Sequence, residues 1–99
     1  MYLHLGQKTV IRSEDILGIF DMEKSTLSAS TRAYLAKSEK EGHVVNVSME
    51  MPKSFVLCCF PDGRETVYIT PIGSATLLKR AGFMEELRNV NADRQELIK

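Results

Sequence analysis

The hydrophobic pattern of this chain is clearest in its middle, where the segment Ser54–Phe60 is almost wholly apolar. A short apolar run bounded by turn residues predicts a strand that is buried on both faces. The run ends at Pro61-Asp62-Gly63, and an alternating segment, Glu65–Thr70, follows it. Pro, Asp and Gly are the residues that tight turns favour, so the two segments predict an antiparallel hairpin at the centre of a sheet.

Four further segments have the alternation or the turn boundaries of strands. Gly6-Gln7 separates the first two as a tight connection, and Gly18 inside the third indicates a bulge or a close backbone approach. The third segment is apolar on both faces, which favours a central place in the sheet. The fourth alternates along its whole length and ends at Pro52, which cannot donate to a ladder. These segments are Tyr2–Leu5, Lys8–Arg12, Ile16–Met22 and Val44–Met51.

One helix is expected before the fourth strand. The segment Thr31–Glu41 follows Ser28 and Ser30, either of which is a good N-cap, and Gly42 is a natural C-terminal stop. Its apolar face is narrow, with charged residues on the solvent side. The apolar residues of that face are Ala33, Tyr34 and Ala36, assisted by Leu27.

A second helix is expected near the C-terminus. The segment Pro71–Gly82 has the order of loop, cap, helix and glycine stop, with Lys79 and Arg80 in the last turn, where cations complement the helix dipole. Beyond it, apolar residues recur at helical spacing before a charged end. We therefore expect a domain over residues 1–82 and a helical or partly disordered extension over 83–99. The expected fold class is α+β: a small, mostly antiparallel β-sheet domain of about six short strands with two helices.

The composition is that of an ordinary globular domain. Ninety-nine residues suit one core, and shares of 43% hydrophobic and 26% charged residues argue against general disorder. No apolar run approaches the ~20 residues that span a bilayer, and the N-terminus lacks the pattern of a secretory signal. Cys58 and Cys59 are adjacent on a predicted strand and so point to opposite faces, which favours buried free thiols in a reducing cytoplasm.

The sequence offers little for catalysis or metal binding. It contains no Gly-rich phosphate loop, no CxxC, no HxxxH and no nucleophile elbow. His4 and His43 are far apart in the sequence and fit surface or capping roles. Glu14 and Asp15 lie in a link between strands, where adjacent acids are usually solvated. We expect no enzyme, no cofactor and no metal.

Positive side chains are the remaining candidates for a functional site. Thirteen basic and thirteen acidic residues cancel, so the net charge alone does not indicate nucleic-acid binding. Cations and hydroxyls nonetheless gather at predicted loops and helix ends, where such groups bind backbone phosphates. The alternative is that Ser74 caps its helix and the cations are only solvated. The candidate phosphate contacts are Lys53, Lys79 and Arg80, with Arg12, Arg32 and Lys8 as weaker choices.

Four segments in order resemble the extracellular matrix regulatory protein family, its RemB members more closely than its RemA members. No segment is diagnostic alone, but their order and spacing over residues 1–81 are fairly specific. The resemblance implies a small bacterial cytoplasmic protein, nucleoid-associated if it binds DNA, that acts on transcription of biofilm-matrix genes. The segments are Met1–Gly6, Ile16–Asp21, Pro52–Leu57 and Tyr68–Arg80.

The resemblance also implies an assembly. RemA-like members look like sheet-based DNA binders whose fold is similar to the LytTR DNA-binding domain. They assemble into rings that engage double-stranded DNA through many subunits at once. For this chain that implies a homo-oligomer in which modest basic patches add up through avidity.

One departure from the family pattern leaves a second function open. The regions where RemA-like members carry arginines read Glu50-Met51-Pro52-Lys53 and Glu14-Asp15-Ile16 in this chain. The alternative is an oligomeric scaffold, or a partner of a paralogous DNA-binding regulator, that makes no DNA contact of its own. Its contact candidates are Met49, Met51, Phe55, Phe83 and Leu87.

Overall fold

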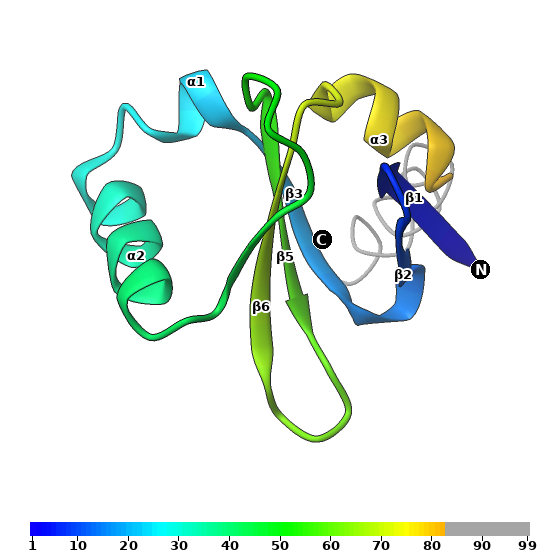
Figure 1. Cartoon of the computed structure of the whole chain (residues 1–99), viewed down its shortest axis with the longest axis horizontal. Coiled ribbons are helices and arrows are strands. Elements are labelled where there is room, and N and C mark those ends of the chain that lie inside the picture. The colour runs from blue at the N-terminus through cyan, green and yellow to red at the C-terminus, as the bar shows by residue number, and fades with distance from the viewer. Residues whose placement is uncertain (83–99) are drawn as a thin grey trace, which may run out of the picture.

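The computed structural model describes residues 1–82, which form two separate β-sheets and three α-helices. The larger sheet has four strands in the order β3 (Ile16–Asp21), β5 (Ser54–Cys59), β6 (Glu65–Thr70) and β4 (Val44–Asn46). The β3–β5 and β5–β6 pairs are antiparallel, whereas β4 runs parallel to β6. The smaller sheet is an antiparallel hairpin of β1 (Tyr2–Gly6) and β2 (Thr9–Arg12). The expected α+β class with a mostly antiparallel sheet is confirmed (Figure 1).

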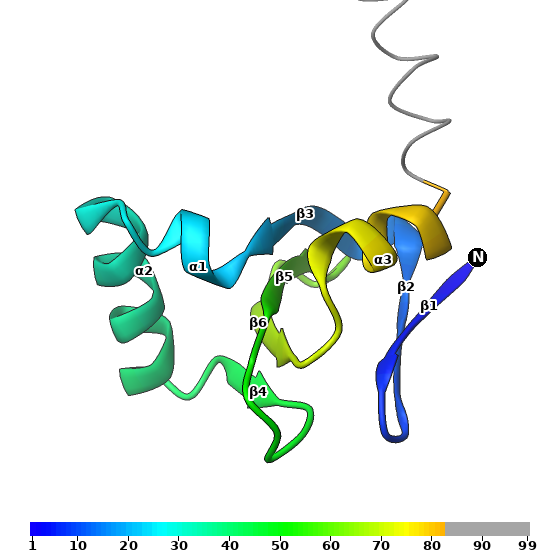
Figure 2. The same ribbon diagram turned by 90° about the horizontal axis from the view of Figure 1, so that it is seen from above.

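The helices lie on both sides of the larger sheet. Helices α1 (Met22–Ser25) and α2 (Ala29–Lys40) are on one side, and α3 (Ser74–Arg80) lies with the β1–β2 hairpin on the other (Figure 2). A single turn of 3-10 helix, Ser13–Asp15, links β2 to β3. Among residues 1–82, no helix has the length and apolar character needed to cross a membrane.

The helix boundaries follow local capping chemistry. The hydroxyl of Ser28 accepts a hydrogen bond from the Thr31 backbone N–H. Ser28, one of the two residues expected as the N-cap, therefore caps α2. Ser74 is not a cap: the N-cap of α3 is Gly73, without a side-chain bond. The short helix α1 was not expected from the sequence, and it begins where the carboxylate of Asp21 accepts the Lys24 N–H.

The hydrophobic core lies between the larger sheet and the hairpin, under α3. Apolar side chains from the inner face of the hairpin meet those of β5 and of α3. The Thr70 hydroxyl donates to the carbonyl of Leu5, which ties the end of β6 to β1. The fully buried members of this core include Leu3, Leu5, Val56, Cys58 and Leu77.

Three expectations about the sheet and the first helix are wrong. Strand β3 is an edge strand rather than a central one, because within the described residues it pairs with β5 on one side and with no strand on the other, whereas β5 and β6 each have two neighbours. The fourth strand ends at Asn46 instead of Met51, since the Glu50 N–H donates to the Ser48 hydroxyl and the chain turns away from the sheet. The expected apolar face of α2 is not buried: its Ala33, Tyr34 and Ala36 are exposed, and so is Leu27.

Other sequence expectations are confirmed. The register between β3 and β5 shifts between Ile16 and Gly18, which is the bulge that Gly18 indicated. Gly82 has a positive φ of 71° immediately after α3, as a glycine stop requires. The helical or partly disordered extension expected over 83–99 lies outside the described residues, so that part of the domain division stays a prediction.

Candidate nucleic-acid interface

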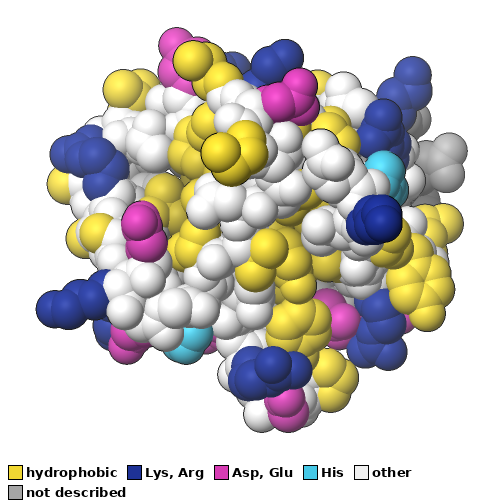
Figure 3. Space-filling view, viewed as in Figure 1, with side chains coloured by type: hydrophobic (Ala, Val, Ile, Leu, Met, Phe, Trp, Pro, Cys, Tyr) yellow, Lys and Arg dark blue, Asp and Glu magenta, His cyan; other side chains and the backbone are white. Residues whose placement is uncertain are grey.

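Four of the six candidate cations lie on the side of the molecule formed by α3 and the hairpin, and one of them, Arg12, is the last residue of β2. Lys79 and Arg80 are exposed in the last turn of α3, and α3 packs against β1. Lys8 is exposed in the turn between β1 and β2. Figure 3 shows Lys and Arg side chains with a histidine gathered along the right-hand border of this face, over these elements. Cations from opposite ends of the described chain therefore lie on the same side of the larger sheet.

The hairpin turn that carries Lys8 has a well-defined local cause. Gly6 and Gln7 both have positive φ, at 116° and 51°, which a tight turn between two strands requires. The His4 ring nitrogen Nε2 lies 2.9 Å from the Gln7 carbonyl oxygen and braces the turn. His4 thus has the surface role that was expected from the sequence.

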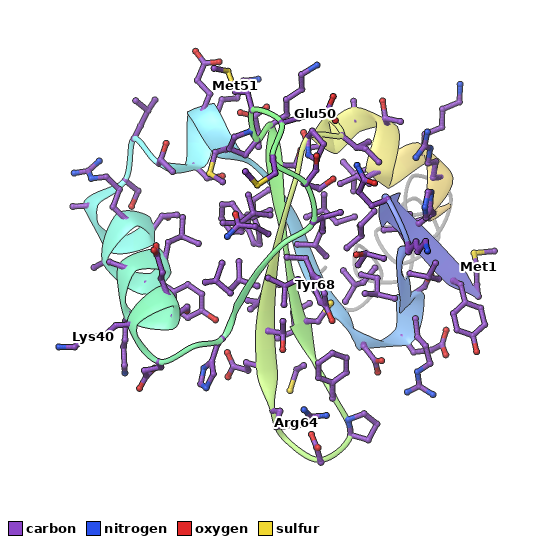
Figure 4. The ribbon with its side chains drawn as sticks, in the orientation of Figure 1. Met1, Lys40, Glu50, Met51, Arg64 and Tyr68 are labelled. Atoms are coloured by element: carbon purple, nitrogen blue, oxygen red, sulfur yellow. The ribbon has the colours of Figure 1, made fainter. Side chains whose placement is uncertain are left out.

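Lys53 is held by its backbone immediately before β5. Its N–H donates to the Thr70 carbonyl at 2.9 Å, and its own carbonyl accepts from the Met22 N–H at 2.9 Å. The side chain is exposed at the end of the loop that carries Glu50 and Met51, both of which point away from the sheet in Figure 4.

Lys53 and the cations of α3 border one rim of the molecule. Lys53 contacts Thr70, which precedes α3, whereas Lys79 and Arg80 lie at the far end of that helix. Residues 71–73 and the whole length of α3 therefore lie between Lys53 and these two cations. That rim is the candidate interface, with Lys53, Lys79 and Arg80 as its exposed cations, and Lys8 is exposed in the hairpin turn on the same side of the sheet (Figure 2).

The other two candidate cations hold the fold together. Arg12 donates from Nε and Nη2 to the two carboxylate oxygens of Asp15, at 3.1 and 3.0 Å. Arg32 donates from Nη1 to the carbonyl oxygens of Thr26 and Leu27, at 2.7 and 3.1 Å. It therefore supplies hydrogen bonds to two backbone acceptors of the segment between α1 and α2. Both guanidinium groups are engaged within the chain, which lowers their availability for a phosphate.

The acids near the third strand have different environments than expected. Asp15 is buried rather than solvated, which corrects the expectation for that residue. The hydrogen bond from Arg12 lowers the pKa of the Asp15 carboxyl, so it stays ionised as one half of a bidentate pair. Glu14 is exposed and lies 3.3 Å from the N-terminal ammonium. The charges of both acids are thus partly offset within the protein.

Acid is expected to weaken the fold through the Arg12–Asp15 pair. A carboxyl whose pKa is lower in the folded state than its unfolded value of ~3.9 adds stability above that value, and loses it as the pH falls through the folded pKa. Below about pH 4, the urea midpoint of the wild type should therefore fall more steeply than that of Asp15→Asn. Arg12→Met removes the same bond from the other side and should flatten the profile similarly. Equal slopes in all three proteins would contradict this role.

The described residues also contain a cavity that separates α2 from the β5–β6 hairpin. It has a volume of about 480 Å³ and charges of both signs on its walls. The Tyr34 hydroxyl donates to the Glu65 carboxylate at 3.0 Å, so that acid is already occupied. His43 lines the cavity after the end of α2. Within residues 1–82, no three His, Cys, Asp or Glu side chains are grouped as metal ligands.

The contact candidates of the alternative function differ in their exposure. Met49 and Met51 are among the most exposed apolar residues of the described region. Phe55 is buried under Phe20 and is not available to a partner. Phe83 and Leu87 lie outside the described residues. Sequence reasoning missed Leu17 and Phe20 as surface residues, because their strand was expected to be central.

Comparison with known proteins adds one clear similarity. No protein-family model matches the chain. The chain is 39% identical over 88 residues to the Extracellular matrix regulatory protein B of Bacillus subtilis (strain 168). The aligned region covers 88% of this chain and 98% of that relative, so the similarity extends over nearly the whole of both proteins.

Proposed function

This chain belongs to the extracellular matrix regulatory protein family, and on that basis we propose that it is a small bacterial transcriptional regulator of extracellular matrix (biofilm) genes. In this proposal it binds double-stranded DNA without enzymatic chemistry or a cofactor, as a homo-oligomer with a LytTR-like subunit. It acts in the cytoplasm.

The observation that carries the proposal is the state of four cations. Lys8, Lys53, Lys79 and Arg80 are exposed, and none of them forms an ion pair with another residue of the described part of the chain. Arg12, by contrast, is paired with Asp15. Cations without a protein partner are available to DNA phosphates, which position a protein on the duplex without reading its sequence.

The zero net charge of the chain is compatible with this role if subunits act together. A few phosphate contacts per subunit give weak attraction, and linking several subunits raises the apparent affinity without any new contact. Each neutralised phosphate also releases counterions, so binding should weaken steeply with salt. A homo-oligomer, proposed as a ring, therefore supplies the larger number of phosphate contacts that one subunit lacks.

A charge-reversal experiment tests the interface. We expect Lys53→Glu/Arg80→Glu to lower the affinity for a duplex of arbitrary sequence by at least about tenfold at 50 mM salt, because two phosphate contacts become repulsive. The slope of log affinity against log salt should become shallower by about one unit per lost contact. Fluorescence anisotropy with a labelled duplex measures both quantities.

The matched control is Lys37→Glu/Lys40→Glu. It makes the same change in net charge on α2, on the other side of the sheet from α3 (Figure 1). If the control loses as much affinity as Lys53→Glu/Arg80→Glu, net charge rather than this rim governs binding. Full affinity in the rim variant would argue against the interface.

A second candidate function is an oligomeric scaffold or partner of a paralogous DNA-binding regulator. It is favoured by the exposure of Met49 and Met51, since adaptable methionine side chains suit a protein contact. Glu50 between them is unfavourable for phosphate. A large particle, by light scattering, that leaves the duplex free at low salt would support this candidate over the first.

A further inference from the structure

The outer edge of β3 is the longest open strand edge of the larger sheet. Among residues 1–82, β3 pairs with β5 on one side and has no neighbouring strand on the other. The opposite edge of the sheet is β4, which is three residues long, whereas β3 has six. An open edge presents backbone N–H and C=O groups that another strand can pair with.

Two apolar side chains on the faces of β3 are exposed beside this edge. Leu17 is 63% exposed and Phe20 is 39% exposed. The Phe20 ring stacks on Phe55, with 4.9 Å between ring centroids and 19° between planes. Gly18 makes this possible, because a Cβ at that position would lie only 2.6 Å from the Phe20 ring. The Phe20 ring is therefore held against the sheet, and Phe20 and Leu17 are the exposed apolar side chains of β3.

The usual features that protect an edge strand are few here. The segment Ile16–Phe20 contains no Lys, Arg or Pro. The one charged residue of β3, Asp21, is at its end and accepts the Lys24 N–H as the N-cap of α1. The bulge between Ile16 and Gly18 disturbs one end, but Gly18–Asp21 pair with β5 in regular register.

We propose that β3 pairs with β3 of a second copy of this chain, antiparallel about a twofold axis, so that two larger sheets become one continuous sheet. The occupant is a second copy because self-pairing brings the same segment of each copy opposite the other. The segment Ile16–Phe20 carries no charge, so it does not repel its own copy. An antiparallel arrangement also places the two Asp21 residues at opposite ends. The proposal rests on the homo-oligomer of the proposed function and names one of its contacts. This twofold contact joins subunits in pairs, so a ring requires a second, different contact between the pairs.

The test compares two substitutions of exposed leucines. Leu17→Lys places a charge on the edge and should raise the protein concentration needed for association at least about tenfold, measured by sedimentation velocity over a dilution series. The control, Leu27→Lys, makes the same chemical change at a residue that is 81% exposed between α1 and α2, and should leave association unchanged.

A second measurement on the unmodified protein covers the case in which Leu17→Lys does not fold. Hydrogen exchange of the β3 amides should slow as the protein concentration rises, because pairing protects the outer edge. A chain that stays monomeric at all concentrations would overturn both this contact and the proposed homo-oligomer. Association that neither protects β3 nor responds to Leu17→Lys would overturn this contact alone. Protection that appears only with a different added protein would also overturn it and assign the edge to that protein.

Discussion

Replacing Leu77 by alanine is expected to lower the free energy of unfolding by ~2–5 kcal/mol, the range for fully buried leucines. Leu77 has no exposed surface and belongs to the core between α3, the hairpin and β5. Helix α3 has seven residues, too few for a stable isolated helix in water, so its position depends on this packing. Urea unfolding followed by circular dichroism measures the change.

The neighbouring leucine provides the matched control. Leu78 is on the same helix but only half-buried, so Leu78→Ala removes the same atoms with less loss of packing. Its destabilisation should be clearly smaller, and equal losses would mean that α3 is held by something other than its buried face. Because α3 also carries Lys79 and Arg80, Leu77→Ala should weaken DNA binding at temperatures where the core begins to open.

The central hairpin could be predicted from sequence because local and global signals agree there. Strand β5 is apolar after its first residue, Ser54, and has a neighbouring strand on each side. Pro61-Asp62-Gly63 has the chemistry of the observed turn. Gly63 has a φ of 88°, which most side chains disfavour. Pattern, turn residues and burial all specify the same structure at this point.

The failures have a tertiary cause. The alternation through Val47 and Met51 suits a strand, but Val47 donates to the Ile69 carbonyl and the chain then turns to reach Lys53. Strand β3 is apolar on both faces, which is typical of a central strand. Its inner face, with Ile19, packs against the core, whereas Phe20 points to the opposite face and is 39% exposed. Single-sequence periodicity does not distinguish a face covered within the chain from an open one.

The candidate site could be predicted only in part. The positions of Lys53 before β5 and of Lys79 and Arg80 at the end of α3 follow from turn and helix boundaries. The engagement of Arg12 depends on the 3-10 turn that brings Asp15 back to it, and that turn carries no strong signal in the sequence. The sequence made Arg12 a weaker candidate than Lys53, but it did not indicate that Arg12 is paired in the fold while Lys53 is exposed.

Cys58, the buried member of the adjacent cysteine pair, should be about three orders of magnitude less reactive than an ordinary exposed thiol. Burial, with a smaller effect from Asp15, raises the pKa of the Cys58 thiol to about 12. At pH 8 such a thiol is ionised in roughly one molecule in ten thousand, against about a quarter for an ordinary thiol with a pKa of ~8.5. Since the thiolate is the reactive form, native Cys58 should react with a maleimide or disulfide reagent only when the core opens.

Counting the labelled thiols by mass spectrometry tests this difference. Cys59 is half-buried on the opposite face of β5, with its Sγ 3.8 Å from the Phe60 carbonyl oxygen, so it should account for the label taken up by the native protein. The wild type should take up one label in buffer and two in urea, and Cys59→Ser should take up none until it is unfolded. Rapid labelling of both thiols in the native wild type would mean that the core under the hairpin opens far more often than its packing implies. In that case the rim cations on α3, which depend on the same core, would not be held in a fixed arrangement.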